Sequence, residues 1–157
     1  MTYFSLATGM PAMKINIDKF DLKDVPVSPD HVFTFPEGLV GFEAQKRFAL
    51  FHEEGKPTVF WLQSLDDSKL SFPVTSPDRL GIDYQIELSE ADCKLLDLND
   101  PEEAIVVVIV YRDDVTDADG GKIAASTRSP LVLNTRSRLG MQKILREIEP
   151  SLVVRAR

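Results

Sequence analysis

The strongest constraint on the fold is the unbroken apolar run AIVVVIVY, which extends from Ala104 to Tyr111. Most of its residues are β-branched, and such side chains favour strands over helices. With eight residues, the run is much shorter than the ~20 residues that a membrane-spanning helix needs. A continuous apolar segment of strand length is typical of a strand with both faces buried. We therefore expect Ala104–Tyr111 to form a central strand of a sheet.

Short strand patterns also dominate the rest of the chain. In HVFTF, which ends at Phe35, the two phenylalanines alternate with Thr34, so they share one face of a strand. Further runs that are rich in β-branched or aromatic residues and bounded by turn residues are RFALFHE, PTVFWLQS, LSFPVTS, DYQIEL, PLVLN and MQKIL. Many short strands with few helices between them indicate an antiparallel sheet. We expect a mainly β fold, a small antiparallel barrel-like or sandwich domain with one or two short helices.

One of these helices is expected in SEADCKLLDL. Ser89 has the residue type of an N-cap, and Asp92 three residues later completes a variant of the capping box. Pro101 follows shortly afterwards, and the residue before a proline is disfavoured in a helix. The helix should therefore begin after Ser89 and end before Pro101.

The stretch FTFPEGLVGFE, from Phe33 to Glu43, is the connection with the most turn-forming residues. Phe35–Gly38 fits a type I turn with proline at the second position and glycine at the fourth. Gly41 permits a second change of direction before Phe42 returns to the core. This reading places Leu39 and Val40 at an exposed tip.

Length and pattern favour one domain. We expect residues 1–12 (MTYFSLATGMPA) to be a disordered leader or a mis-assigned start, because they lack the patterning that begins at Met13. Residues 13–146 should form a single β-rich domain, and residues 147–157 a C-terminal tail. Cys93 is the one cysteine, so no internal disulfide can form, which suits a reducing compartment.

The charge is distributed unevenly about a net value of −7. Residues 1–119 contain 10 basic and 23 acidic residues, whereas residues 120–157 contain 8 basic and 2 acidic ones. An acidic body repels nucleic-acid phosphates and favours a basic protein partner. The basic C-terminal segment leaves an RNA contact open as a rival hypothesis.

The residue types needed for enzyme chemistry do not form recognisable groups. His31 and His52 lie in separate predicted strands, and the acidic neighbours of Cys93 should raise the pKa of its thiol. The loop RDDVTDADGG departs from a calcium-binding loop, because Val115 and Ser126 stand where ligands are required. We expect no catalytic residue, cofactor or metal site. A metal-dependent enzyme that uses the acidic loops stays a rival hypothesis.

Several blocks of sequence resemble the FliW family of bacterial flagellar assembly factors. The blocks are FTFPEGLVGFE with KRFAL after it, FWLQSLDD, LSFPVTSP, DYQIELSEAD and SPLVLNTRSRLGMQ. They follow the family's order and are spread over residues 13–146. The resemblance implies a cytoplasmic, non-enzymatic protein with a small β-rich, barrel-like fold.

The resemblance also implies partners. Family members bind CsrA, a small dimeric RNA-binding protein that represses flagellin translation, and they bind flagellin itself. When flagellin is exported, the FliW-like protein returns to CsrA and relieves repression, acting away from the RNA surface as an allosteric antagonist. The expected partners are thus CsrA and flagellin, with no direct nucleic-acid or membrane contact, and the protein alone is expected to be a monomer.

Some segments depart from the family's pattern. STRSP (Ser126–Pro130) stands where members often have NLLAP, PDRLGIDY (Pro77–Tyr84) stands where they have PFLFFPDY, and the ending EIEPSLVVRAR differs. If the altered apolar positions contact a partner, partner choice has changed. The alternative is therefore a divergent paralogue, a dedicated flagellin chaperone without CsrA binding.

The partner surface is expected near LSFPVTS. A proline cannot donate to a central ladder, so it marks an edge strand or a bulge, and an edge strand can accept another chain. We expect the CsrA-facing surface to comprise Phe72, Pro73, Asp83 and Tyr84. A second candidate patch comprises Arg136, Arg138 and Gln142. A core position for Phe72 and a solvated strand end for the second patch stay open as alternatives.

Overall fold

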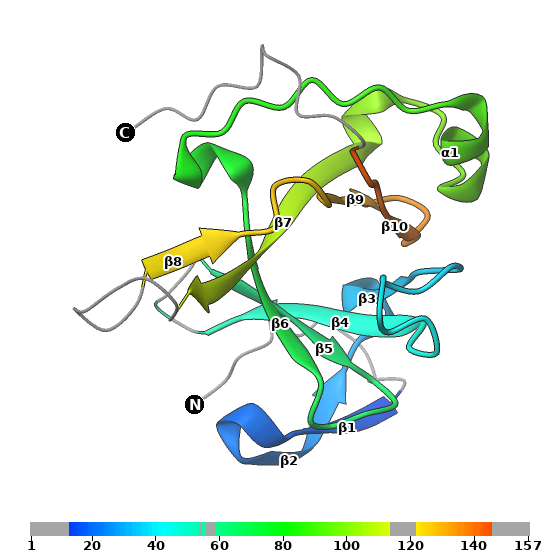
Figure 1. Ribbon diagram of the computed structural model, residues 1–157. Helices are drawn as coiled ribbons and strands as arrows, with labels where there is room; N and C mark the ends of the chain where they lie inside the picture. The colour runs from blue at the N-terminus through cyan, green and yellow to red at the C-terminus, as the bar shows by residue number, and fades with distance from the viewer. Residues whose placement is uncertain (1–12, 54, 56–58, 114–121, 146–157) are drawn as a thin grey trace.

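The computed structural model describes residues 13–53, 55, 59–113 and 122–145 (Figure 1). The expected leader (1–12) and tail (147–157), and most of the acidic loop RDDVTDADGG, lie outside the described residues. The described strands are β1 (Met13–Ile17), β2 (Leu22–Val27), β3 (Val32–Thr34), β4 (Arg47–His52), β5 (Phe60–Ser64), β6 (Ser71–Thr75), β7 (Ala104–Asp113), β8 (Lys122–Ala125), β9 (Leu131–Asn134) and β10 (Gly140–Gln142). The helices are α1 (Glu90–Leu95) and the 3-10 turns η1 (Asp18–Phe20), η2 (Pro29–His31), η3 (Pro77–Leu80) and η4 (Pro101–Glu103).

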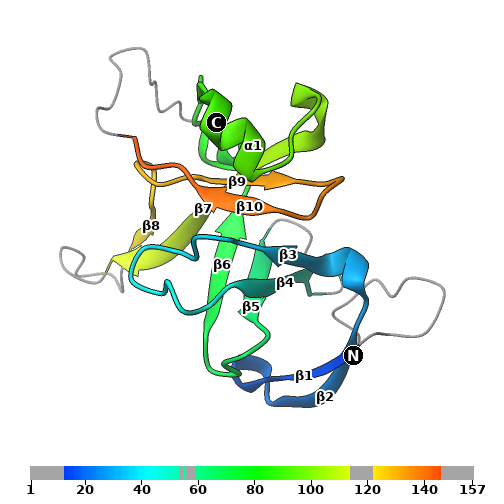
Figure 2. The ribbon, with the colours of Figure 1, turned by 90° about the vertical axis from the view of Figure 1, so that its right-hand side faces the viewer.

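The main sheet has eight strands and nearly closes on itself. Its order is β10-β9-β7-β6-β5-β4-β3, with β8 paired to β7, and every strand pair is antiparallel. The two ends of this path meet where Thr34 and Leu139 form a parallel bridge and the Thr34 amide donates to the Arg138 carbonyl at 2.8 Å. Figure 2 shows the β9–β10 hairpin beside β3 at this seam. The expected mainly β, barrel-like fold is confirmed.

Strand periodicity explains how the core is divided. In β4, Phe48 and Leu50 point to the barrel interior, whereas Ala49 and Phe51 pack under the separate β1–β2 hairpin. The β4 strand is therefore covered on both faces. A third cluster joins Leu96, just after α1, to the outer side of the β9–β10 hairpin. Figure 1 shows α1 beside β9 and β10, and the β1–β2 hairpin at the other end of the molecule.

The apolar run forms the long strand β7, but its burial is incomplete. Val107 and Val108 are buried, whereas Ile105 is 40% and Tyr111 51% exposed. The prediction of a central strand is confirmed, because β7 pairs with β6, β8 and β9. The prediction that both faces are buried throughout was wrong. β7 is longer than its pairing with β6, which involves only Val108 and Ile109, so its ends extend past the core.

Two other predicted strands differ from the structure. Asp83–Leu88 contains no strand, although exposed and half-buried residues alternate along it. The alternating sequence pattern therefore correctly indicated one half-buried face of this segment. It did not indicate a strand, because the segment forms no backbone ladder with a neighbour. MQKIL is a strand only as far as Gln142. By contrast, α1 has the predicted capping box, in which Ser89 and Asp92 exchange hydrogen bonds of 3.0 and 3.1 Å.

The loop between β3 and β4 contains both expected turns. The Gly38 amide donates to the Phe35 carbonyl at 2.9 Å, and the Phe42 amide to the Leu39 carbonyl at 2.7 Å. Gly38 and Gly41 have φ values of +69° and +86°. The predicted exposure holds for Val40 but was wrong for Leu39. The Leu39 side chain is buried among the interior phenylalanines because the tight first turn directs it back into the barrel.

The two glycines predict different responses to substitution. An L side chain with positive φ costs about 1–2 kcal/mol at either position. At Gly38, an added Cβ would also lie 2.7 Å from the Glu43 backbone, whereas at Gly41 it would meet nothing within 4 Å. Gly38→Ala should therefore lower the free energy of unfolding, measured by urea denaturation, clearly more than Gly41→Ala does. Equal losses would show that the contact with Glu43 does not constrain the loop.

Candidate functional site

Exposed apolar side chains gather at the loop between β3 and β4. Among the described residues, the exposed large hydrophobic side chains are those of Val40, Phe42, Ile105, Tyr111 and Ile144. Val40 is 65% and Phe42 41% exposed, and both lie on the second turn of this loop. The sequence predicted that Phe42 returns to the core, where its side chain would be buried. That prediction was wrong, because the ring contacts Phe72 but remains 41% exposed.

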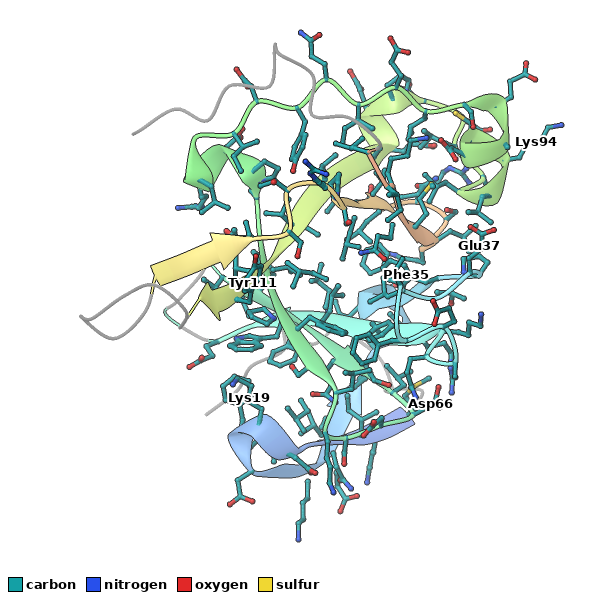
Figure 3. The ribbon with its side chains drawn as sticks, viewed as in Figure 1. Lys19, Phe35, Glu37, Asp66, Lys94 and Tyr111 are labelled. Atoms are coloured by element: carbon teal, nitrogen blue, oxygen red, sulfur yellow. The ribbon has the colours of Figure 1, made fainter. Side chains whose placement is uncertain are left out.

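The turn is held against β10. The Val40 amide donates to Gln142 Oε1 at 2.8 Å, across a separation of 102 residues. Next to this bond, Gly140 lies so close to the Phe35 ring that an added Cβ would be 2.7 Å from it. Figure 3 shows Phe35 between the β9–β10 hairpin and the strands below it. The exposed turn therefore rests on a packed base, which preorganises it for contact with another molecule.

Ile144 lies on the same side of the chain as Gln142. Beyond β10 the pairing continues, because the Lys143 amide donates to the Pro130 carbonyl at 2.9 Å and the Leu145 amide to the Arg128 carbonyl at 2.8 Å. In such an extended segment, residues two apart share a face. Ile144 is 50% exposed. The sequence reading missed it because the apolar pattern of MQKIL does not distinguish core from surface.

Phe72 completes this surface. Its ring packs edge-on against Phe42 with centroids 5.2 Å apart, and it also packs against the buried Phe48, with centroids 6.1 Å apart. We use the name Phe42 patch for Val40, Phe42, Phe72, Gln142 and Ile144. Ring contact and hydrogen bonding join the first four in pairs, and alternation along the extended chain places the exposed Ile144 on the side of Gln142. Glu43 borders the turn and accepts the Gly41 amide at 3.0 Å, and this hydrogen bond lowers the pKa of the Glu43 carboxyl.

The strand that carries Phe72 and Pro73 is not the edge strand that was predicted. β6 lies between β5 and β7, and Pro73 stands opposite Trp61 of β5. The register with β7 covers only Val74 and Thr75, so Pro73 lies just beyond the β7 ladder. This placement explains how an interior strand tolerates a residue without an amide hydrogen.

Asp83 and Tyr84 lie in the segment after η3, which is assigned to no strand. Asp83 is exposed, whereas Tyr84 is half-buried and its hydroxyl donates to the Thr127 carbonyl. Burial raises the pKa of Tyr84 to about 12. Tyr84 thus contacts the STRSP segment, while Phe72 contacts Phe42 and Phe48. The Tyr84 hydroxyl therefore joins the segment after η3 to the STRSP segment.

Arg136 and Arg138 leave the β9–β10 turn in different settings. The Arg136 Nε donates to Glu103 Oε2 at 2.5 Å, and its Nη2 donates to the Asp97 carbonyl. The Arg136 side chain therefore ties this turn to the segments beside η4. Arg138 instead places its guanidinium carbon 5.5 Å from the centroid of the Phe33 ring, at a separate cleft. Gln142 is the one member of the second predicted patch that reaches the Phe42 patch.

Within the described ranges, no three His, Cys, Asp or Glu side chains are grouped to hold a metal ion. No helix in the described part of the chain has the length and apolar character required to cross a membrane.

Removal of the Tyr84 hydroxyl tests its structural role. Tyr84→Phe should lower the free energy of unfolding by about 0.5–1.5 kcal/mol, because the Thr127 carbonyl loses a hydrogen bond. Tyr111→Phe is the matched control, since Tyr111 is 51% exposed. Urea denaturation of both variants makes the comparison. A similar small effect of the two substitutions would contradict the role assigned to Tyr84.

The same hydroxyl predicts how stability changes at high pH. Its pKa is 10.0 in the unfolded chain and about 12 when folded, so the unfolded state releases the proton first. The contribution of Tyr84 is full below pH 10.0 and is lost as the pH rises through about 12. Stability of the native protein should therefore fall more steeply in this range than that of Tyr84→Phe.

Comparisons with known proteins agree with the fold and with the sequence blocks. The family described as FliW protein matches residues 16–155. A flagellar assembly factor FliW from Azoarcus sp. (strain BH72) is 42% identical over 147 residues, which are 92% of this chain and 99% of that protein. The protein of the same name from Chromobacterium violaceum is 38% identical, with 82% and 92% covered. A crystal structure of the flagellar assembly factor FliW superposes with a TM-score of 0.71 at 24% identity, covering 92% of this chain and 95% of that one.

Proposed function

This chain belongs to the FliW family of flagellar assembly factors, and on that basis we propose that it is a cytoplasmic partner switch that binds CsrA and flagellin. Binding to CsrA relieves translational repression allosterically, away from the RNA surface. Binding to flagellin withdraws the protein from CsrA. Flagellin synthesis is thereby coupled to flagellin export, and the protein acts through contacts instead of catalysis.

The observation that carries this proposal is the Phe42 patch. Protein interfaces have an apolar centre with aromatic anchors and a polar rim. The Phe42 patch combines an aromatic pair, two exposed aliphatic side chains and the Gln142 amide, with Glu43 beside them. The hydrogen bond from Val40 to Gln142 fixes the turn before a partner arrives, so little ordering is needed on binding.

The charge of the chain supports a basic partner. Residues 1–119 carry 23 acidic and 10 basic residues, and they supply the turn and Phe72. A net negative body attracts a basic RNA-binding protein and speeds its encounter. The same negative charge repels RNA phosphates, so the protein itself should not bind the RNA that CsrA recognises.

One observation favours the alternative of a dedicated flagellin chaperone. In the STRSP segment, Arg128 is exposed and the Thr127 carbonyl accepts the Tyr84 hydroxyl. Family members often have apolar residues at these two positions. If only one partner contacts this segment, a charged side chain in place of an apolar one would weaken binding of that partner and leave binding of the other unchanged.

Calorimetric titration with CsrA from the same organism tests the proposal. Val40→Asp should weaken binding at least tenfold, because it places a charge at the centre of the Phe42 patch and an interface anchor contributes about 2 kcal/mol or more. The fold should survive, since Val40 is 65% exposed and its amide remains available to Gln142. Melting temperature is measured alongside.

Tyr111→Asp is the matched control, because it adds the same charge at an exposed residue outside the Phe42 patch. It should leave CsrA affinity within about threefold of the native value, as expected for a surface change away from the anchors. If both variants weakened CsrA binding equally, the effect would come from net charge, and the Phe42 patch would not be the CsrA site. Binding of flagellin without any binding of CsrA would establish the chaperone alternative.

A further inference from the structure

We propose that the cleft beside Arg138 is a second binding site, which receives an apolar side chain from a protein segment while Arg138 pairs with an adjacent carboxylate. This site is separate from the Phe42 patch and shares no residue with it. We name it the Arg138 cleft, and its lining includes His31, Phe33, Leu50, Phe60, Ile105 and Arg138. The inference does not require CsrA or flagellin to be the partner.

The shape of the Arg138 cleft defines what can enter. Its volume is about 270 Å³, and its lining residues come from η2, β3, β4, β5, β7 and the β9–β10 turn. Ligand pockets for whole small molecules or cofactors usually span about 300–1,000 Å³. The cleft is therefore suited to one large side chain. Ile105, which is 40% exposed, leaves part of the apolar wall uncovered.

The charge at the mouth of the cleft selects an anionic neighbour. Arg47 pairs with Asp66 at 3.1 Å and Arg136 with Glu103 at 2.5 Å. Among the described residues, by contrast, no carboxylate lies within ion-pair distance of the Arg138 guanidinium. The guanidinium carbon lies over the Phe33 ring instead, 5.5 Å from its centroid. A guanidinium group can bind a carboxylate through two parallel N–H donors.

The backbone at Arg138 gives an independent reason to assign a role to its side chain. Its φ is +63°, in the left-handed region where glycine or asparagine would be more stable. The turn is fixed by the Arg138 amide, which donates to the Asn134 carbonyl at 3.0 Å. The left-handed backbone disfavours arginine at this position, and a binding role of the guanidinium would explain why arginine is present there.

The other titratable groups of the cleft define the local charge. Burial lowers the pKa of His31, and the Arg138 charge acts in the same direction while Asp30 opposes it. His52 also lines the cleft, and its Nδ1 lies 3.0 Å from the Glu53 carbonyl. Arg138 is thus the permanent cation of the site. Asp30 is an acidic lining residue that should weaken the attraction of a carboxylate.

A carboxylate fits this site better than a nucleic-acid phosphate. A single guanidinium above an apolar cleft can pair with one carboxylate next to an apolar side chain. Nucleic acid requires several cations, because its affinity comes from neutralising many phosphates. The surrounding body is acidic, with 23 acidic and 10 basic residues in positions 1–119. A segment of protein with a large apolar residue beside a carboxylate is therefore the favoured occupant.

N-acetyl-L-phenylalanine is a direct probe, and its amide is the matched control ligand. Titration of the isotope-labelled full chain, followed by backbone amide shifts, should locate binding at Phe33, Leu50 and Ile105. The acid should bind about tenfold more tightly than the amide, because a hydrogen-bonded ion pair is lost in the amide. Equal affinity of the two probes, shifts elsewhere or no binding would overturn the proposal.

Three variants refine the test. Arg138→Asn removes the guanidinium but tolerates the left-handed backbone, so the fold should be kept while the preference for the acid disappears. Asp30→Asn should tighten binding of the acid. Arg79→Gln removes the same charge from an exposed residue of η3 and should change nothing. If Arg138→Asn still preferred the acid over the amide, the role assigned to Arg138 would be contradicted. Displacement of the acid from this cleft by oligouridine would also contradict the proposal, because it would favour RNA as the occupant.

Discussion

The closure of the sheet between β3 and the β9–β10 turn is the interaction on which the rest of the structure depends. Strands at the two ends of a seven-strand path meet through the Thr34–Leu139 bridge and the hydrogen bond from Thr34 to the Arg138 carbonyl. This near-closure joins the two ends of the strand path and encloses the phenylalanine-rich interior. Gly140 makes it possible, because the Phe35 ring occupies the space that any larger residue would need.

Both candidate sites flank this closure. On one side, Gln142 holds the turn that carries Val40 and Phe42. On the other, the turn before β10 brings Arg138 over Phe33. The buried Asn134 supports that turn. Its Nδ2 donates to the Leu96 carbonyl at 2.9 Å, and its Oδ1 accepts the Arg136 and Ser137 amides. A buried amide whose donor and acceptor are both hydrogen-bonded favours one geometry of the β9–β10 turn, from which Arg138 extends.

The sequence predicted local order well and long-range contacts poorly. Alternation placed Phe33 and Phe35 correctly in the core, and the capping box located α1. Pro73 indicated an edge because proline lacks an amide hydrogen, yet the register between β6 and β7 leaves room for it inside the sheet. The role of Gln142 depends on a hydrogen bond to Val40, 102 residues away, which no local pattern contains. The β1–β2 hairpin was missed for the same kind of reason, because its burial depends on β4.

The central claim is that one protein exchanges two partners, and the most direct test is a competition experiment. The native protein is first bound to fluorescently labelled CsrA, and flagellin is then added while the release of CsrA is followed by anisotropy. The account predicts that flagellin displaces CsrA, with a midpoint that rises as the CsrA concentration is raised. A stable complex that contains both partners at saturating flagellin would contradict it, because flagellin could then not withdraw this protein from CsrA.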